Sequence, residues 1–319
     1  HQQNFFQVGP LATVRYLLAL RRLRYDVSIN THPQSKIHYR VAAWLIGARQ
    51  RLSHEYDNSG WLDRWLVNCA TPQDYAVHSV ENNFRLVQLL DPPAQPRVHA
   101  FELFLTPEEL AAAQKQAAPL KQGSRRLVAV HVGSGKTKNL TLKRWPIDRW
   151  IAFIQRALQE LADCTVLLLG GPDEKEDNER ILRTVAHPRV VAPATRSIRD
   201  AAALMQHCEV FISVDNALMH CAAAVQVPRQ ILIESPTFGP TLEPYRRPYT
   251  LVPNPAVHGR NLEYYRYDGR GIHGSREELI RCMQAVTPEA VFETLAKVLA
   301  DDRAVQGKPP LASARALGP

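Results

Sequence analysis

The sequence lacks the features that mark a membrane-spanning, disulfide-bonded or nucleic-acid-binding protein. No run of about 20 apolar residues is present, so no segment is predicted to cross a bilayer as a helix. The five cysteines are scattered and never form a C-x-x-C pair, which argues against a disulfide framework or a zinc site and fits a reducing cytoplasm. Helix-turn-helix, RNP and zinc-finger patterns are missing, so no nucleic-acid partner is expected.

What is present is the composition of an ordinary globular protein of two domains. The 319 residues include 45% hydrophobic and 22% charged residues. We expect a first domain over residues 1–122, a second over 123–300, and a disordered tail rich in Pro, Ala and Gly over 301–319. The net charge of +8 suits an anionic substrate or an anionic membrane surface, although a solvated basic surface is an equal alternative.

Hydrophobic periodicity predicts an α/β fold with parallel strands. In the first domain we expect helices at 11–24, 38–47, 78–90 and 106–117, strands at 25–30 and 48–53, and a linker at 118–126. In the second domain we expect strands at 127–132, 164–170, 189–193, 209–214 and 229–234, helices between them, and closing helices at 274–283 and 287–300. This alternation predicts βαβ units and a parallel sheet.

Ligands of such sheets bind at the carboxyl ends of the strands, and the loop that follows strand 127–132 suits a phosphate. Small residues let the backbone approach a ligand, and cations supply charge: Ser134, Gly135, Lys136, Lys138, Lys143 and Arg144. A P-loop is rejected because Val130 stands where its first glycine is required. The next helix also starts at Pro146, far beyond Lys136, and no G-x-G-x-x-G follows any strand.

Two further loops carry candidate residues. In the segment 170–174, Glu174 either caps the next helix or accepts a hydrogen bond from a ribose hydroxyl. After strand 209–214, Asp215 is followed by Asn216 and Ala217, which open a helix whose free N–H groups can bind phosphate. His220 lies one turn further and is either a ligand of the same anion or a core histidine. We favour the anion site, because an acid, a helix start and a histidine converge there.

Together these motifs resemble glycosyltransferase family 9, the lipopolysaccharide heptosyltransferases. The resemblance covers residues 125–300 well and 11–117 more loosely. It rests on three motifs that occur in the family's order and spacing: His131, Gly133 and Ser134 with Lys143, Trp145, Pro146 and Trp150; the LLGGPDE segment 168–174; and Asp215, Asn216, Ala217 and His220 with the alanines 222–224.

The resemblance implies a GT-B fold, in which two Rossmann-like domains face each other across a cleft. It implies an inverting transfer of heptose from an ADP-sugar to a lipopolysaccharide or other glycan acceptor, with no cofactor and no required metal. The enzyme would be cytoplasmic, with an option of peripheral contact with the inner membrane. Lys143 would stabilise the leaving diphosphate. The implied donor-binding residues are His131, Ser134, Gly135, Glu174, Asp215, Asn216, Ala217 and His220.

Two departures from the family pattern keep alternatives open. The opening Gly-Asp loop of the family, which carries the proposed general base, has no counterpart, so we expect the first domain to be incomplete at its start. Asn216 and Ala217 stand where the family has Ser or Thr and Gly, which leaves the exact sugar open. The alternatives are a non-catalytic or inactive nucleotide-sugar-binding relative and another GT-B enzyme, such as an epimerase.

Overall fold

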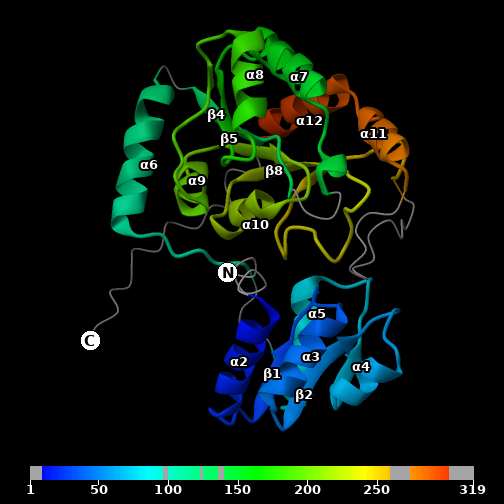
Figure 1. Ribbon diagram of the computed structural model, residues 1–319. Helices are drawn as coiled ribbons and strands as arrows, with labels where there is room; N and C mark the ends of the chain where they lie inside the picture. Colours follow the sequence, from blue (N-terminus) through cyan, green and yellow to red (C-terminus); the bar gives the residue numbers. More distant parts are fainter. Residues whose placement is uncertain (1–8, 96–99, 123–124, 136–139, 259–273, 302–319) are drawn as a thin grey trace. The chain divides into compact units, whose positions relative to one another are not determined.

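The computed structural model describes residues 9–95, 100–122, 125–135, 140–258 and 274–301. These residues form two compact units, each with its own parallel sheet (Figure 1). The N-terminal unit contains residues 9–95 and Gly239–Glu243. The C-terminal unit contains Ala100–Phe238, residues 244–258 and residues 274–301. The predicted α/β class is confirmed.

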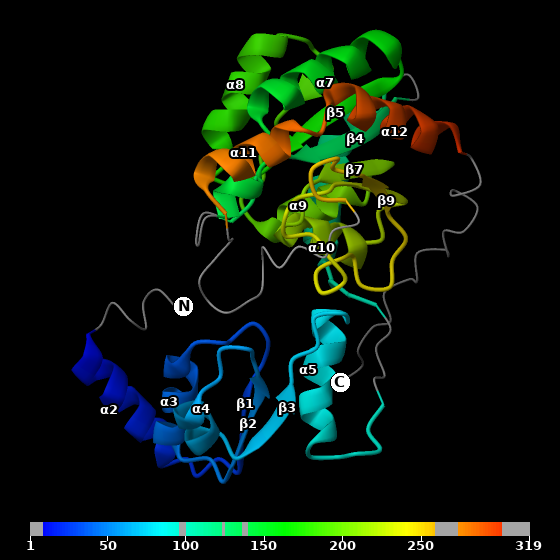
Figure 2. The ribbon, with the colours of Figure 1, turned by 90° about the vertical axis from the view of Figure 1, so that its right-hand side faces the viewer.

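The N-terminal unit is built on a three-stranded parallel sheet in the order β1-β2-β3. Its strands are β1 (Val27–Asn30), β2 (Gln50–Glu55) and β3 (Cys69–Pro72), and its helices are α2 (Pro10–Arg21), α3 (Ile37–Ile46), α4 (Trp61–Leu66) and α5 (Ser79–Gln88). Helices α3 and α4 cover one face of the sheet, with α2 beside α3, and α5 covers the other face (Figure 2).

Helix α4 and strand β3 are not among the elements predicted from the sequence, and both have weak sequence signals. Helix α4 is only six residues long and leaves both of its tryptophans exposed, so its apolar residues do not mark an inward face. Strand β3 is four residues long, alternates between half-buried and exposed side chains, and ends at Pro72. Short elements with little burial are held by their neighbours, so local patterns do not reveal them.

The C-terminal unit is built on a six-stranded parallel sheet in the order β6-β5-β4-β7-β8-β9. Its strands are β4 (Arg126–His131), β5 (Cys164–Leu169), β6 (Val190–Val191), β7 (Val210–Ser213), β8 (Arg229–Ile233) and β9 (Thr250–Val252). Its α-helices are α6 (Pro107–Leu120), α7 (Ile147–Glu160), α8 (Lys175–Val185), α9 (Ile198–Met205), α10 (Ala217–Ala224), α11 (Arg276–Gln284) and α12 (Pro288–Ala300). The strands predicted from apolar runs are confirmed, and β9 is additional.

Alternate residues of the central strand β4 point into two hydrophobic cores. Val128 and Val130 join the core formed with α7, α8, α11 and α12. Leu127 and Ala129 join the core formed with α6, α9 and α10. This period of two, with both faces covered, explains why the strands are apolar throughout. The sheet is therefore a rigid base for the loops at its edge.

Helix α6 belongs to the C-terminal unit, whereas the sequence analysis placed it in the first domain and a linker after it. It packs against α9, and Arg199 ties it there. The Nε of Arg199 lies 2.5 Å from Oε1 of Glu109, and its Nη2 donates to the Phe104 carbonyl at 2.6 Å. These contacts are long-range, so the composition of the 118–126 segment could not show them.

Two further predictions concern the C-terminal tail and the absence of a membrane-spanning segment. The tail expected at 301–319 lies outside the described residues, apart from Asp301. Within the described residues, no helix has the length and apolar character needed to cross a bilayer.

Candidate functional site

The chain direction across the six-stranded sheet reverses at β4. From β4 the chain proceeds outward to β5 and β6, and it then returns to β7 on the other side of β4. At such a switch point the loops after the two strands diverge and leave a crevice at their carboxyl ends, where ligands of open α/β sheets bind. The loops after β4 and β7, which the sequence analysis singled out, start side by side at this point.

A buried ion pair between Lys143 and Asp215 joins these two loops. The Nζ of Lys143 lies 2.5 Å from Oδ2 of Asp215, and the two side chains are only 8% and 4% exposed. Lys143 ends a short 3-10 helix, η1 (Leu140–Lys143). Two residues later Trp145 is fully buried, donates its Nε1–H to the Val286 carbonyl at 3.0 Å and packs edge-on against Trp150. These tryptophans anchor the segment that carries Lys143.

Two hydroxyl groups complete the surroundings of Asp215. Ser235 donates to Oδ1, and the Oγ1 of Thr237 lies 3.0 Å from both carboxylate oxygens. Both residues are buried and follow β8, the next strand along the sheet edge. Neither residue is among the site residues predicted from the sequence. The available signal was their position after a strand of the same sheet.

Arg144 organises a second network of charges beside the first. Its Nη2 lies 3.1 Å from Oε1 of Glu174 and donates to the Ser134 carbonyl at 2.8 Å, while its Nη1 lies 3.3 Å from Oδ2 of Asp177. The other oxygen of Glu174 accepts the Gly171 N–H at 3.1 Å. Glu174 is therefore held by partners within the chain, and its contact with a ribose hydroxyl stays a prediction that uses its remaining lone pairs.

Gly133 makes room for this network. A Cβ at Gly133 would lie 2.2 Å from Oε1 of Glu174, a distance that no side chain tolerates. Gly135 is exposed, and a Cβ there would lie 3.1 Å from Cδ1 of Leu140. Ser134 donates its hydroxyl to the Leu140 carbonyl at 2.7 Å, which fixes the loop. The candidate cations Lys136 and Lys138 lie outside the described residues.

His131 ends β4 and is buried at the same sheet edge. Its Nδ1 lies 3.0 Å from the Leu169 carbonyl oxygen. Because a carbonyl oxygen only accepts, Nδ1 carries the proton and Nε2 is the acceptor of the neutral ring. Burial lowers the pKa of His131, and the Leu169 carbonyl offsets this only in part. The ring is therefore neutral at pH 7 and would accept a hydrogen bond from a ligand rather than supply charge to a phosphate.

Helix α10 starts at the carboxyl end of β7 with Asn216 as its N-cap. The Oδ1 of Asn216 accepts the Met219 N–H at 3.0 Å, and its Nδ2 donates to the Val214 carbonyl at 2.8 Å. The same Nδ2 lies 3.4 Å from the Gly133 carbonyl oxygen, so Asn216 also links the two loops. Ala217 is exposed at the first helical position, where N–H groups have no acceptor within the helix. This end of the helix suits an anion.

His220 is half-buried one turn into α10. The ring of Phe101 packs edge-on against its imidazole, with ring centroids 5.4 Å apart. Phe101 in turn contacts Tyr245 at 5.6 Å between centroids, so the imidazole is oriented by an aromatic group. This aromatic group was not predicted, because Phe101 and Tyr245 lie far from His220 in the chain. The contact of His220 with a donor stays a prediction.

The N-terminal unit has a polar cluster of its own at the carboxyl ends of β1 and β2. The Oδ1 of Asn83 accepts the His32 N–H at 2.6 Å and lies 3.3 Å from Nε2 of His54. The hydroxyl of Tyr56 lies 3.3 Å from Nδ1 of His32. Burial, followed by the nearby His54, lowers the pKa of His32 to about 4. This cluster was not predicted from the sequence, although His32, His54 and Tyr56 lie at or just after the ends of β1 and β2, because Asn83 joins them from α5.

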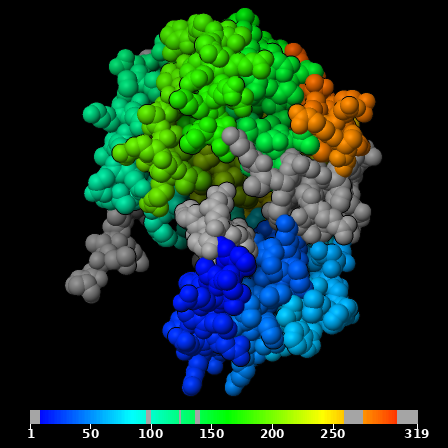
Figure 3. Space-filling view, in the orientation of Figure 1, coloured from blue at the N-terminus to red at the C-terminus, as the bar shows by residue number. Residues whose placement is uncertain are grey.

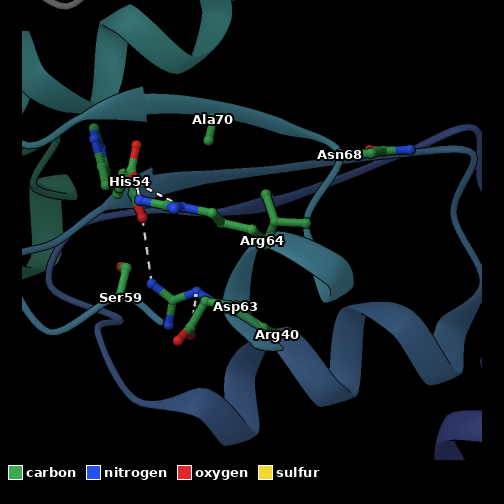
Figure 4. A pocket seen from close by; sticks show the side chains of 9 residues that line it. Arg40, His54, Ser59, Asp63, Arg64, Asn68 and Ala70 are labelled. Atoms are coloured by element: carbon green, nitrogen blue, oxygen red, sulfur yellow. Dashed lines mark hydrogen bonds and ion pairs between the residues drawn. The ribbon is translucent and has the colours of Figure 1, made fainter. Parts of the chain in front are cut away.

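A cavity of about 170 Å³ lies between α4 and strands β2 and β3 (Figure 4). Arg40 on its wall is almost fully buried and uses its guanidinium within the chain. Its Nε lies 3.0 Å from Oδ1 of Asp63, and its Nη1 and Nη2 donate to the carbonyls of Ser35 and His54 at 2.9 and 3.2 Å. Arg40 therefore braces α3 against α4 and β2, which identifies it as structural.

Residues 14–258 match the family described as glycosyltransferase family 9 (heptosyltransferase). The chain belongs to glycosyltransferase family 9. It is therefore a glycosyltransferase, as its resemblance to the family implied. No curated protein sequence matches it.

Three solved structures show the fold of this glycosyltransferase. The Escherichia coli ADP-heptose lipopolysaccharide heptosyltransferase II is 19% identical, with a TM-score of 0.62 over 90% of this chain and 80% of that chain. A family 9 glycosyl transferase from Veillonella parvula is 18% identical, with a TM-score of 0.66 over 91% and 80%. E. coli heptosyltransferase WaaC with ADP-2-deoxy-2-fluoro heptose is 18% identical, with a TM-score of 0.55 over 89% and 75%. The shared architecture confirms the predicted GT-B fold.

Thr237→Val tests the support of Asp215. The substitution keeps the shape of the side chain but removes the hydroxyl beside both oxygens of a buried carboxylate. We expect the free energy of unfolding, measured by urea denaturation at pH 7.5, to fall by about 1–3 kcal/mol. Thr250→Val, at an exposed position of β9, should change it by less than about 0.5 kcal/mol. Equal stability of the two variants would show that the hydroxyl does not support Asp215.

Gly133→Ala tests the close packing of the loop after β4 against Glu174. The added methyl must displace the Glu174 carboxylate, so we expect a loss of about 1–3 kcal/mol in the free energy of unfolding. Gly171→Ala is the matched control in the same network, because its Cβ would meet no atom closer than 4.0 Å. The prediction fails if urea denaturation finds both alanine variants equally stable.

His32→Gln tests the cost of burying a neutral histidine in the N-terminal unit. Because the pKa of His32 is about 4 in the folded chain and 6.5 as a free group, the unfolded chain takes up the proton first as the pH falls. Stability is therefore lost from pH 6.5 down to pH 4, by about 3 kcal/mol in total. His32→Gln should lessen the fall in stability between pH 7.5 and pH 4.5.

The control for His32→Gln is Tyr56→Phe, which removes the hydroxyl beside His32 but keeps the titrating ring. It should lower stability at both pH values and keep most of the difference between them, because burial is the main cause of the lowered pKa of His32. Urea denaturation at the two pH values gives both quantities. A pH dependence that is the same in His32→Gln and in the wild-type chain would contradict the assignment.

Proposed function

We propose that this glycosyltransferase moves a heptose-like sugar from an ADP-sugar to a lipopolysaccharide core acceptor, with inversion at the anomeric carbon. The observation that carries the proposal is the buried pair of Lys143 and Asp215 beside the N-terminal end of α10, at the switch point of the sheet. A cation, free N–H groups and a crevice together suit a nucleotide diphosphate. The similar fold of E. coli heptosyltransferase WaaC, whose structure contains ADP-2-deoxy-2-fluoro heptose, supports the same class of donor.

Lys143 is the residue that we propose for stabilising the leaving diphosphate. An ammonium group has three donors, and Asp215 accepts only one of them in the structure. The others can bind phosphate oxygens without loss of the ion pair. The backbone N–H groups of the first turn of α10, which starts at Ala217 at the positive end of the helix dipole, add to the attraction. Charge that develops on the departing ADP would be stabilised in place, as in other preorganised sites.

The proposed reaction is a direct displacement. An acceptor hydroxyl oxygen attacks the anomeric carbon while the bond from that carbon to the diphosphate oxygen breaks, so that ADP leaves from the opposite face. The hydroxyl proton passes to a general base, which the family supplies as a carboxylate, and we assign no residue of this chain to that role. The absence of a required metal and cofactor is part of the same proposal.

The other predicted donor residues have proposed roles that follow from their surroundings. Ser134 and Gly135 present the loop backbone to the phosphates, and Asn216 and Ala217 present the start of α10. His131, neutral with Nε2 as an acceptor, suits a donor hydroxyl or amine. Glu174 is proposed to bind a ribose hydroxyl, and His220 is proposed to bind the diphosphate. The acceptor, as a glycolipid, would place the enzyme in the cytoplasm beside the inner membrane.

Lys143→Met tests the proposal. The assay measures the release of ADP from ADP-heptose with truncated lipopolysaccharide core as acceptor. We expect kcat/KM to fall by about 100-fold or more. Because the substitution leaves Asp215 buried without its counter-charge, Lys143→Met/Asp215→Asn should be measured beside it. The double variant restores neutrality but not the cation, so it should stay as slow. Lys175→Met, at an exposed position on α8, is the matched control and should keep wild-type kinetics.

The outcomes separate the alternatives. Wild-type kcat/KM in a folded Lys143→Met chain would contradict the site. If calorimetry shows that the wild-type chain binds ADP-heptose but no ADP is released, the nucleotide-sugar-binding alternative is favoured. Tighter binding of UDP than of ADP would favour a different nucleotide-using enzyme of the GT-B class.

A further inference from the structure

Three of the five tryptophans lie on the surface of the N-terminal unit. Trp44 is 40% exposed, Trp65 is 58% exposed and Trp61 is 79% exposed, whereas Trp145 and Trp150 in the C-terminal unit are completely buried. An indole ring in water forgoes a large part of the hydrophobic free energy that burial would give. Three such rings in one small unit form an apolar surface that suits a partner.

The three rings form one continuous surface, here called the tryptophan ridge (Trp44, Trp61 and Trp65). Trp61 and Trp65 are four residues apart on α4 and so lie on the same side of that helix. The ring centroids of Trp65 and Trp44 are 5.5 Å apart, which joins α4 to α3. Helices α3 and α4 are neighbours in the outer helical layer of this unit (Figure 2). The ridge therefore runs across two adjacent helices.

Exposed arginines gather at the same end of the helical layer. Trp44 lies in the last turn of α3, and the Nη1 of Arg21, at the end of α2, donates to the adjacent Leu45 carbonyl at 3.3 Å. The exposed arginines that surround the C-terminal ends of these two helices are Arg21, Arg22, Arg24 and Arg49. Residues of α2 are visible at the surface, in dark blue, in Figure 3. Asp26 is the acidic residue in this stretch, so the local charge is positive.

We propose that the tryptophan ridge and its flanking arginines bind an anionic phospholipid surface. Indole rings have an apolar body and a polar N–H, and they favour the headgroup level of a bilayer. Arginines beside them are attracted to anionic headgroups. A second copy of the chain fits less well, because a twofold contact would bring the same arginines of both copies together. This contact lies outside the donor site and concerns a different partner from the nucleotide sugar.

Vesicle flotation with the full chain tests the proposal. The wild-type chain should float with vesicles of phosphatidylcholine mixed with phosphatidylglycerol, bind pure phosphatidylcholine more weakly, and lose binding to the mixed vesicles as salt increases. Trp61→Ser/Trp65→Ser should weaken binding at least about tenfold. Phe104→Ser is the matched control, since it removes an aromatic ring that is 81% exposed in the C-terminal unit. Arg22→Gln/Arg24→Gln should remove most of the preference for the anionic vesicles.

Brominated lipids give a second readout, because they should quench part of the tryptophan fluorescence in the wild-type chain and not in the double tryptophan variant. If that variant loses its far-UV circular dichroism, Trp61→Ser alone serves, at the most exposed ring. Unchanged vesicle binding in folded variants would overturn the proposal. So would sedimentation that shows a wild-type dimer without vesicle binding and a monomeric tryptophan variant. The vesicles carry no glycan, so failure here is distinct from failure to release ADP.

Discussion

The buried pair of Lys143 and Asp215 is the constraint on which the rest of the site depends. Removing both charges from water costs several kcal/mol for each ion unless close contacts compensate. The hydroxyls of Ser235 and Thr237 hold the carboxylate, so its position does not depend on the lysine alone. The lysine ammonium has further donors, which we propose for an incoming anion. In the proposed donor site, a phosphate would share a cation that the fold has already placed and desolvated.

The order of the strands explains why these groups meet. Lys143 comes from the loop after β4, Asp215 from the loop after β7, and Ser235 from the loop after β8, which are consecutive neighbours in the sheet. Their carboxyl ends share one edge, so a separation of 72 residues in the chain becomes a direct contact. The two cores that bury β4 on both faces keep that edge rigid. The site therefore follows from topology as much as from its residue types.

Sequence analysis could predict what is local or periodic. Apolar runs revealed the long strands, capping residues revealed α6, and the rule that ligands bind at carboxyl ends selected the loops at His131 and Asp215. It could not reveal that Arg144 pairs with Glu174, or that α6 packs in the C-terminal unit through Arg199, since both depend on contacts between distant segments. The cluster at His32 was not predicted because its residues come from separate segments, follow no periodic pattern and belong to none of the recognised motifs.

The family motif around Lys143 combines two physical roles that the sequence alone does not separate. Trp145 and Trp150 are buried in the core and touch each other, and Arg144 pairs with Glu174 and Asp177 at the start of α8. Only Lys143 points to the Asp215 centre. A long flexible lysine side chain loses conformational entropy when its ammonium group is held in one place. Because the buried tryptophans already fix the backbone at Lys143, only the side chain remains to be ordered. The aromatic part of the motif thus acts by positioning, and the lysine carries the proposed chemistry.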